Sequence, residues 1–306
     1  MGATFGAMNE IRVLTDPDLV VTPSSSHGRR QPGIGMRLAS PRVFLWLASA
    51  ILLAFLLVPL AAIFIRAIPS GAFNDSLGDP VVREALQLSL VTTALTLLVA
   101  IVLGTPVAYL LARYRFRGRD TLDTLIELPM VLPPAVAGVA LLMAFGRRGI
   151  LGPTLSTVFG LEIPFTTLAV VMAQTFVAAP FFIKAAKAGF ESVDPDLEHV
   201  AATLGISRIQ TFWSVTVPLS LPALMGGAVM AWARALGEFG ATIMFAGNFM
   251  GRTQTMPLAI YQTMESGRLN AALVLSSILI VVSFSVLIIF KGLARFAVGD
   301  IGQPNA

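Results

Sequence analysis

The chain has 306 residues, of which 56% are hydrophobic and 12% are charged, and its mean hydropathy is +0.81. Soluble domains carry about a quarter charged residues, so this composition excludes an ordinary water-soluble protein and indicates a membrane protein. The net charge of +4 indicates membrane orientation and lipid contact rather than a nucleic-acid partner. The absence of cysteine excludes disulfides and thiolate chemistry, and two histidines, His27 and His199, argue against a histidine-rich metal site.

Residues 1–42 are rich in proline, serine, glycine and arginine and predict a flexible basic tail. A secretory signal is not expected, because the apolar run that follows is long and lacks a small-residue cleavage pattern. Met36 stands shortly before that run, so a translation start at Met36 is a further hypothesis, which N-terminal sequencing tests. Residues 292–306 are expected to form a C-terminal tail.

Six apolar runs are long enough to cross a hydrocarbon core of about 30 Å as helices. They are continuous rather than alternating, so they predict an all-α membrane protein with six transmembrane helices and no β-barrel. Prolines and glycines inside several runs favour a bundle around a pathway over a simple anchor. The expected spans are 43–65, 86–112, 125–145, 165–183, 219–247 and 271–290.

The distribution of lysine and arginine predicts the orientation of these spans. With the N-terminus inside, 14 of the 21 basic residues fall in cytoplasmic segments, where short loops normally carry them. Both termini are therefore expected to be cytoplasmic. The longest cytoplasmic connection is then the loop 187–218, between the fourth and fifth spans.

The first half of this loop predicts a short amphipathic helix. Asp194 is placed as its N-cap, Pro195 as its first residue and Gly205 as its end. Apolar residues recur at i, i+3, i+4 and i+7, which gives the helix one apolar face. That face consists of Leu197, Val200, Ala201 and Leu204.

After Gly205, Ser207 is expected to cap a second helix that ends near Pro218. An amphipathic helix in such a loop can pack under its own bundle, lie among the lipid headgroups, or dock into a groove of another protein. Composition alone favours the first two alternatives. The expected apolar face of the second helix consists of Ile209, Phe212 and Trp213.

The loop resembles the signature of permease subunits of ATP-binding-cassette importers, EAA, three residues, G, nine residues, I, any residue, LP. Gly205 is followed by nine residues and then by the segment 215–218, so the spacing from glycine to proline fits. The glutamate of the motif falls on His199, whereas the nearest acid is Glu198. The two alanines of the motif fall on Val200 and Ala201.

The resemblance implies a type I importer permease bundle in which this loop helix sits in a cleft of a separate ATPase. The chain has three lysines, and none lies in a Walker pattern, so ATP and magnesium are expected to be bound by that partner. No catalytic residue, cofactor or metal is expected in this chain. The residues expected to couple to the ATPase are Asp194, Leu197, Glu198, His199, Val200, Ala201, Ala202, Leu204, Gly205 and Pro218.

Three further stretches, 127–138, 145–152 and 233–261, resemble permeases for molybdate, which are close to those for tungstate and sulfate. The resemblance covers the expected transmembrane domain, 84–291. It implies a bacterial cytoplasmic-membrane protein that translocates molybdate, or the related tungstate or sulfate. The implied partners are a second copy of the chain, two ATPase subunits, an extracytoplasmic oxyanion-binding protein and membrane lipid.

Arg234 and Glu238 lie four residues apart in the fifth expected span, where ionisable residues are costly. A mutually neutralising structural pair on one helix face is favoured. The alternative is a role in the anion path or gate, together with Gly237 and Gly240.

Arg147 and Arg148 are expected at the outer mouth, as ordinary loop charges or as contacts for the binding protein or an approaching anion. Glu127 is expected near the cytoplasmic end of its span and is assigned no chemistry.

The competing function is a secondary transporter of a small anion driven by an ion gradient. Such a protein favours inverted repeats and several carboxylates or histidines inside its spans, and only Glu238 and Glu127 are present there. An intramembrane hydrolase is excluded, because both histidines fall outside the expected spans.

Overall fold

The structure, a computed structural model, describes residues 41–68 and 78–299. Residues 1–40 of the expected tail, including Met36, and residues 300–306 lie outside the described residues. The chain divides into two units, 1–53 and 54–306, and the division falls inside the first helix. The helices are α1 (Pro41–Ala67), α3 (Pro80–Arg113), α4 (Arg119–Val131), α5 (Pro134–Phe145), α6 (Gly152–Phe159), α7 (Thr167–Ser192), α8 (Pro195–Thr203), α9 (Arg208–Thr211), η2 (Phe212–Thr216), α10 (Val217–Leu236), α11 (Gly240–Ala246), α12 (Met256–Glu265) and α13 (Leu269–Gly299).

The described residues are helical, without strands, as the continuous apolar runs predict. Within residues 41–68 and 78–299, five helices are long and apolar enough to span a membrane, or six if the bent pair α4 and α5 forms one span. Four of the expected spans, 43–65, 86–112, 165–183 and 271–290, are continuous helices here: α1, α3, α7 and α13.

The expected span 125–145 is broken. Leu132 and Pro133 separate α4 from α5, and the two helices are bent by 116°. A proline cannot donate the helical hydrogen bond, and it disfavours helical backbone in the residue before it, so Leu132 is extended. The expectation that this range forms a single helix is wrong, although α4 and α5 together can still form one span.

The expected span 219–247 is also broken, because α10 ends at Leu236 and α11 begins at Gly240. Glycines then bring α11 unusually close to α5. A Cβ atom on Gly138 would lie 2.7 Å from the carbonyl oxygen of Ala241, and one on Gly240 would lie 2.7 Å from the Cβ of Pro134. The second halves of the two broken spans therefore pack backbone to backbone.

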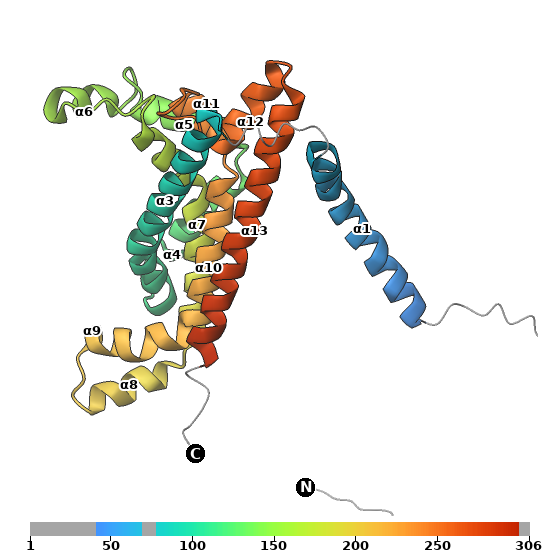
Figure 1. The fold of residues 1–306 in the computed structure, drawn as a ribbon. Coiled ribbons are helices and arrows are strands. Elements are labelled where there is room, and N and C mark those ends of the chain that lie inside the picture. Colours follow the sequence, from blue (N-terminus) through green and yellow to red (C-terminus); the bar gives the residue numbers. More distant parts are fainter. Residues whose placement is uncertain (1–40, 69–77, 300–306) are drawn as a thin grey trace, which may run out of the picture. The chain divides into compact units, whose positions relative to one another are not determined.

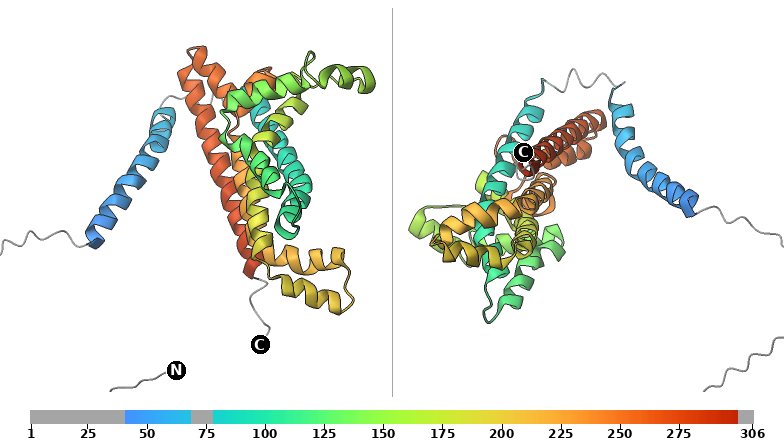
Figure 2. Two further views of the ribbon diagram at one scale, coloured as in Figure 1. Left: turned by 180° about the vertical axis from the view of Figure 1, so that it is seen from behind. Right: turned by 90° about the horizontal axis from the view of Figure 1, so that it is seen from below.

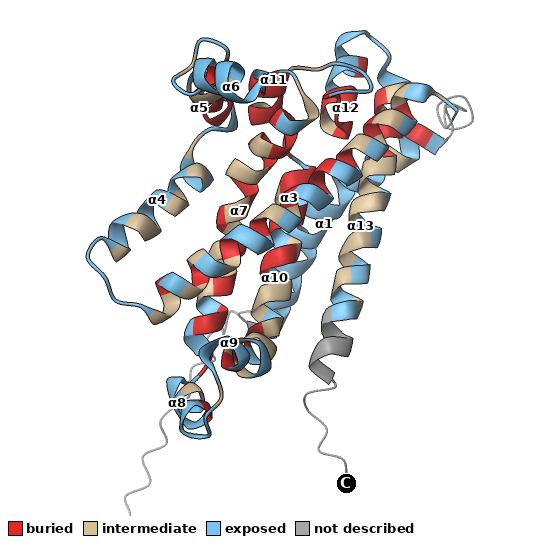
Figure 3. Ribbon diagram, turned by 90° about the vertical axis from the view of Figure 1, so that its left-hand side faces the viewer, coloured by how far each residue is buried: buried red, intermediate tan, exposed pale blue. Residues whose placement is uncertain are grey.

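The core of the second unit forms around α7, with α3 and α10 packed along it (Figure 1). Figure 3 shows buried residues along α7 and on the faces of α3 and α10, and further buried residues on α11 and α12. Small residues dominate this core, as is usual where helices approach closely in a membrane. One buried cluster consists of Ala100, Ala108, Phe182, Ala186, Phe190, Ala228 and Ala231.

Two groups of short helices lie at opposite ends of this bundle. Helices α8 and α9 lie across one end, next to the end of α3 and the start of α10 (Figures 1 and 2). Helices α5, α6, α11 and α12 lie at the other end. The loop expected in the cytoplasm is thus separated by the length of the bundle from Arg147 and Arg148, which are expected outside.

Candidate functional site

The first loop helix, α8, has the caps that the sequence predicts. Asp194 is the N-cap, and its Oδ1 atom accepts a hydrogen bond of 2.9 Å from the backbone N–H of Asp196. Gly205 has a φ of +78°, a left-handed conformation that favours glycine, just after the helix ends. Both ends of α8 are therefore fixed by local interactions, which makes a short, defined rod.

The apolar face of α8 does not pack under the bundle. Leu197, Val200 and Leu204 are 47%, 57% and 73% exposed, whereas Ala201 is buried. An apolar face that is left open in this way is available to headgroups or to a partner protein. His199 and Ala202 are exposed as well, and the His199 Nδ1 atom lies 3.6 Å from the Oδ1 atom of Asp196.

The second loop helix begins as predicted but does not end near Pro218. The Ser207 hydroxyl accepts a hydrogen bond of 3.3 Å from the backbone N–H of Gln210, and the helical path then runs from Arg208 to Leu236. The π-helical turn η2 makes this continuity possible, because it widens the helix just before Pro218, which stands in the first turn of α10. The prediction that Pro218 ends this helix is wrong. The expected loop 187–218 also overlaps both flanking helices, since α7 extends to Ser192.

Glu198 points back into the protein. Its Oε1 atom lies 2.9 Å from Nη2 and 3.1 Å from Nε of Arg113, at the end of α3, and accepts a 2.8 Å hydrogen bond from the Thr216 hydroxyl. Arg113 also donates a 2.9 Å hydrogen bond to the carbonyl oxygen of Val193. The Arg113 and Glu198 side chains are only 11% and 20% exposed. We call Arg113, Glu198 and Thr216 the loop clamp; it joins α3, α8 and η2.

Helix α4 is attached to α7 by a ladder of ion pairs. None of its residues is buried, and in Figure 3 it lies beside α7 as a separate rod. The basic and acidic partners are spaced by about one helical turn on each helix, so the pairs form successive rungs. The rungs are Arg119 with Glu191 at 3.1 Å, Asp123 with Lys187 at 2.6 Å, and Glu127 with Lys184.

Arg234 and Glu238 form the expected ion pair, with 2.7 Å between Nη1 and Oε2. The Glu238 side chain is 1% exposed and that of Arg234 is 28% exposed. They do not share a helix face, because α10 ends before Glu238. The other carboxylate oxygen of Glu238 instead accepts a 2.7 Å hydrogen bond from the backbone N–H of Ala241, at the start of α11.

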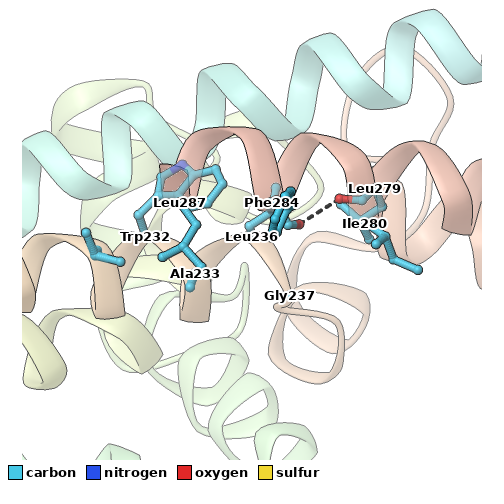
Figure 4. Close-up of a pocket in the computed structure, with 10 residues that line it drawn as sticks. Trp232, Ala233, Leu236, Gly237, Leu279, Ile280, Phe284 and Leu287 are labelled. Atoms are coloured by element: carbon cyan, nitrogen blue, oxygen red, sulfur yellow. Dashed lines mark hydrogen bonds between the residues drawn. The ribbon is translucent and has the colours of Figure 1, made fainter. Parts of the chain in front are cut away.

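A cavity of about 430 Å³ between α10 and α13 reaches Gly237 (Figure 4). Its lining is almost entirely apolar, and the one hydroxyl, that of Ser283, donates to the carbonyl oxygen of Leu279 at 2.7 Å. The cavity offers no charged group to an anion. The residues labelled in Figure 4 are Trp232, Ala233, Leu236, Gly237, Leu279, Ile280, Phe284 and Leu287.

At the opposite end of the bundle, Arg147 pairs with Glu162 at 2.6 Å, and both side chains are largely exposed. Arg148 is exposed and has no ion pair among the residues that the structure describes. The structure thus distinguishes the two arginines: one is neutralised locally and the other is open to an approaching molecule.

A family model for the inner membrane component of binding-protein-dependent transport systems matches residues 100–297. The chain belongs to that family. The permease is therefore a multi-pass inner-membrane transport subunit and not an enzyme; in such systems ATP hydrolysis belongs to a partner subunit.

Several similar relatives are named as molybdenum or molybdate/tungstate permeases. The chain is 44% identical to the molybdenum transport system permease protein ModB of Mycobacterium tuberculosis, over 76% of this chain and 86% of that protein. It is 40% identical to ModB of Escherichia coli, over 70% of this chain and 94% of that one. It is 34% identical to the molybdate/tungstate permease protein WtpB of Pyrococcus abyssi, over 80% and 92% of the two chains.

Solved importers share the fold at low sequence identity. A bacterial alginate ABC transporter chain matches with a TM-score of 0.68 and 16% identity, over 83% of this chain and 95% of that one. A chain of the MetNI methionine ABC transporter matches with a TM-score of 0.57 and 17% identity, over 71% and 96% of the two chains. The fold of this permease is thus that of an ABC importer permease.

The loop clamp and the ion-pair ladder were not predicted from sequence. Their ion-pair partners lie 57 to 85 residues apart, and spacing rules cover only neighbours along a helix. One signal was available: acids and bases gather at one end of the expected spans, Glu191 and Glu198 in one connection and Arg113 and Arg119 in another. The roles of the predicted loop, pathway and outer-mouth residues stay predictions.

Proposed function

We propose that this permease is the membrane-spanning subunit of an ATP-driven importer of molybdate, with tungstate as the near-isosteric second substrate. The inference that ATP is the energy source rests on α8. This capped helix lies at the end of the bundle, and its exposed apolar face can dock to an ATPase. The names of the relatives in M. tuberculosis, E. coli and P. abyssi support the substrate. Sulfate is the more distant candidate.

In this proposal α8 docks through Leu197, Val200 and Leu204 into the cleft of an ATPase subunit. These side chains are exposed, and the opposite side of the helix is held by Glu198 in the loop clamp. A rigid rod with one face on the partner and the other on α3 transmits a displacement better than a flexible loop does. The inward direction of Glu198 supports a role for this acid within the permease rather than at the ATPase.

The proposed assembly contains two copies of this chain, two ATPase subunits that bind ATP and magnesium, and an extracytoplasmic oxyanion-binding protein. Both termini and the α8 end of the bundle are placed in the cytoplasm. The support is the concentration of basic residues at that end, since Arg113 and Arg119 join the exposed Arg115 and Arg117 there. Arg148, exposed at the other end, is the proposed outer contact.

We place the gate at the breaks of the two discontinuous spans. Discontinuous membrane helices commonly line substrate paths, and here Pro134 and Gly240 meet where both spans resume. The Arg234 charge is neutralised by Glu238, so a passing dianion meets no free cation that would retain it. Gly240, which has no side chain, allows the close approach to Pro134 at this point.

The alternative, an ion-gradient-driven transporter, is less favoured by the charges inside the protein. Among residues whose burial is described, Glu238 is the one buried ionisable side chain, and it is already paired. Proton coupling normally needs carboxylates or histidines that are free to titrate in the path.

The test is ATP hydrolysis by the reconstituted permease, ATPase and binding protein in lipid nanodiscs. We expect hydrolysis to rise when molybdate or tungstate is added with the binding protein, and to rise less with sulfate. A permease that carries Leu197→Asp and Val200→Asp should fail to bind the ATPase, whereas Ile150→Asp, at an exposed apolar position at the opposite end of the bundle, serves as the control. Equal hydrolysis with all three anions would contradict the substrate, and ATPase binding by the α8 variant would contradict the docking face.

A further inference from the structure

We infer that a groove between α3 and the second loop helix binds one anionic phospholipid. The groove has a volume of about 620 Å³, within the usual range for sites that hold a small amphipathic ligand. It is lined by α3 on one side and by α9 and η2 on the other. Its lining residues are Ile101, Val102, Thr105, Pro106, Tyr109, Tyr114, Arg208, Ile209, Phe212 and Trp213.

The part of the groove farther from the loop is apolar. Ile101, Val102 and Pro106 come from consecutive turns of α3, and Val102 is 57% exposed. Ile101 stands eight residues before Tyr109, which corresponds to about 12 Å of helix. This segment therefore provides an apolar track along the span that is long enough for much of an acyl chain.

The part next to the loop contains hydrogen-bond donors that have no acceptor within the described residues. Arg208 is exposed and forms no ion pair within the described residues. The hydroxyl groups of Tyr109 and Tyr114 have no hydrogen-bond partner there either. One guanidinium and two phenol groups at the mouth of an apolar track match a phosphate headgroup attached to an acyl chain.

Aromatic side chains place this mouth at the level of the headgroups. Tyr109 packs edge-on against Phe212, with ring centroids 5.0 Å apart, and Phe212 against Trp213, at 5.2 Å. Trp213 is 64% exposed. Tyrosine and tryptophan concentrate at membrane interfaces, where the ring is buried in the apolar layer and the polar atom meets water.

Charge decides among the possible occupants. An apolar helix of a second copy would cover Ile101 and Val102 but leave Arg208 desolvated without a counter-charge, which is costly. A free oxyanion would be placed against apolar side chains. A phospholipid with a net negative headgroup satisfies both halves of the groove, and a zwitterionic one gives Arg208 less attraction.

The groove adjoins the loop clamp, so a bound lipid would affect how firmly the loop is held. Phe212 lines the groove at the start of η2, and Thr216 at the end of the same π-helical turn donates to Glu198 of the loop clamp. A lipid wedged between α3 and η2 would therefore stabilise the joint through which the loop moves.

Native mass spectrometry of the delipidated permease, without ATPase, tests the site with phosphatidylglycerol and phosphatidylcholine as probes. We expect wild type to retain phosphatidylglycerol about fivefold better than phosphatidylcholine, the change expected from one basic residue at an anionic surface. R208A should lose this preference and R208K should keep it. R117A removes a matched exposed arginine that does not line the groove, and it should behave as wild type.

A second variant tests the apolar part of the groove. T105W fills the groove without changing charge, and it should lower the retention of both lipids while the thermal unfolding midpoint stays near that of wild type. If T105W does not fold, the exposed pair R208A and R208K still decides the outcome. Equal retention of the two lipids by wild type, or an unchanged preference in R208A, would overturn the inference.

The chain contains no cysteine, so a single cysteine at Ile209 reports a competing occupant cleanly. We expect I209C to resist disulfide formation with a second copy in nanodiscs. Efficient crosslinking between two copies would assign the groove to the contact between protomers and overturn the lipid site.

Discussion

The Nη2 atom of Arg113 lies 2.9 Å from the Oε1 atom of Glu198, although the two residues are 85 positions apart in the sequence. Arg113 is the last residue of α3, and Glu198 stands in the middle of α8. The pair is mostly shielded from water, and Thr216 shares the same carboxylate oxygen. One charged contact therefore joins α8 to α3, a helix long and apolar enough to span a membrane.

The loop clamp predicts energetic coupling between Arg113 and Glu198. A double-mutant cycle of R113A, E198A and the double variant should give a coupling of about 1–3 kcal/mol in the free energy of unfolding in detergent, because hydrogen bonds between charged, shielded groups are strong. The cycle of Arg147 and Glu162, which are exposed, should give below about 1 kcal/mol. Equal coupling in the two cycles would show that the clamp is an ordinary surface pair.

At Gly205 we predict that any other residue lowers the stability of the loop. A side chain there meets no atom within 4 Å, so its cost comes from the backbone at φ +78°. G205V should lower the stability of the loop by about 1–2 kcal/mol and abolish anion-stimulated ATP hydrolysis while the permease still inserts. The matched control is G226V, at a helical glycine of α10 that also has no atom within 4 Å of a built Cβ. Normal stimulation in G205V would contradict a role for the end of α8.

Because α5 and α11 approach closely, we predict that adding a single methyl group at Gly138 destabilises the protein. G138A places a Cβ 2.7 Å from the backbone oxygen of Ala241, and backbone cannot move aside as a flexible side chain can. Unfolding in detergent should show a loss of about 1–3 kcal/mol, the usual cost of overpacking. G226A, in the open part of α10, should be neutral or slightly stabilising. The same small effect in both variants would mean that the two half-helices are not packed as described.

We predict that Arg234 stabilises the protein and does not determine its anion preference. R234Q leaves the carboxylate of Glu238 buried without a counter-charge, so we expect a loss of up to about 3 kcal/mol, the low end for a buried pair because Arg234 is partly exposed. R234Q with E238Q should recover part of that loss. Size-exclusion chromatography measures assembly, and ATP hydrolysis with each anion measures preference. A changed anion preference with normal assembly would place Arg234 in the anion path instead.

The sequence predicts the local parts of this site and misses the parts that depend on distant neighbours. The caps at Asp194, Gly205 and Ser207 follow from residue type and position within a few residues, and the structure has them. The helix continues through Pro218 because of the π-helical turn before it, and the spacing of apolar residues does not predict such a turn. The inward direction of Glu198 depends on Arg113, and sequence spacing does not bring them together.

In the two broken spans as well, the sequence predicts local features but not those that depend on distant neighbours. Prolines and glycines at 133, 134, 237 and 240 mark both regions as unusual membrane helices, but α4 and α5 together are still apolar enough to pass as one span. Apolar length alone therefore predicts one helix where the structure has two. The bend of 116° between α4 and α5 follows from the consecutive prolines and from the packing of α5 against α11.

The central claim is that ATP hydrolysis by a partner, transmitted through α8, drives an oxyanion across this permease. The most direct test is uptake of radioactive molybdate into proteoliposomes that contain the permease, the ATPase and the binding protein, with ATP or with an imposed proton gradient as the energy source. We predict uptake that requires ATP and the ATPase, is unaffected by the gradient, and is lost in G205V. Uptake driven by the gradient without ATPase would contradict the claim.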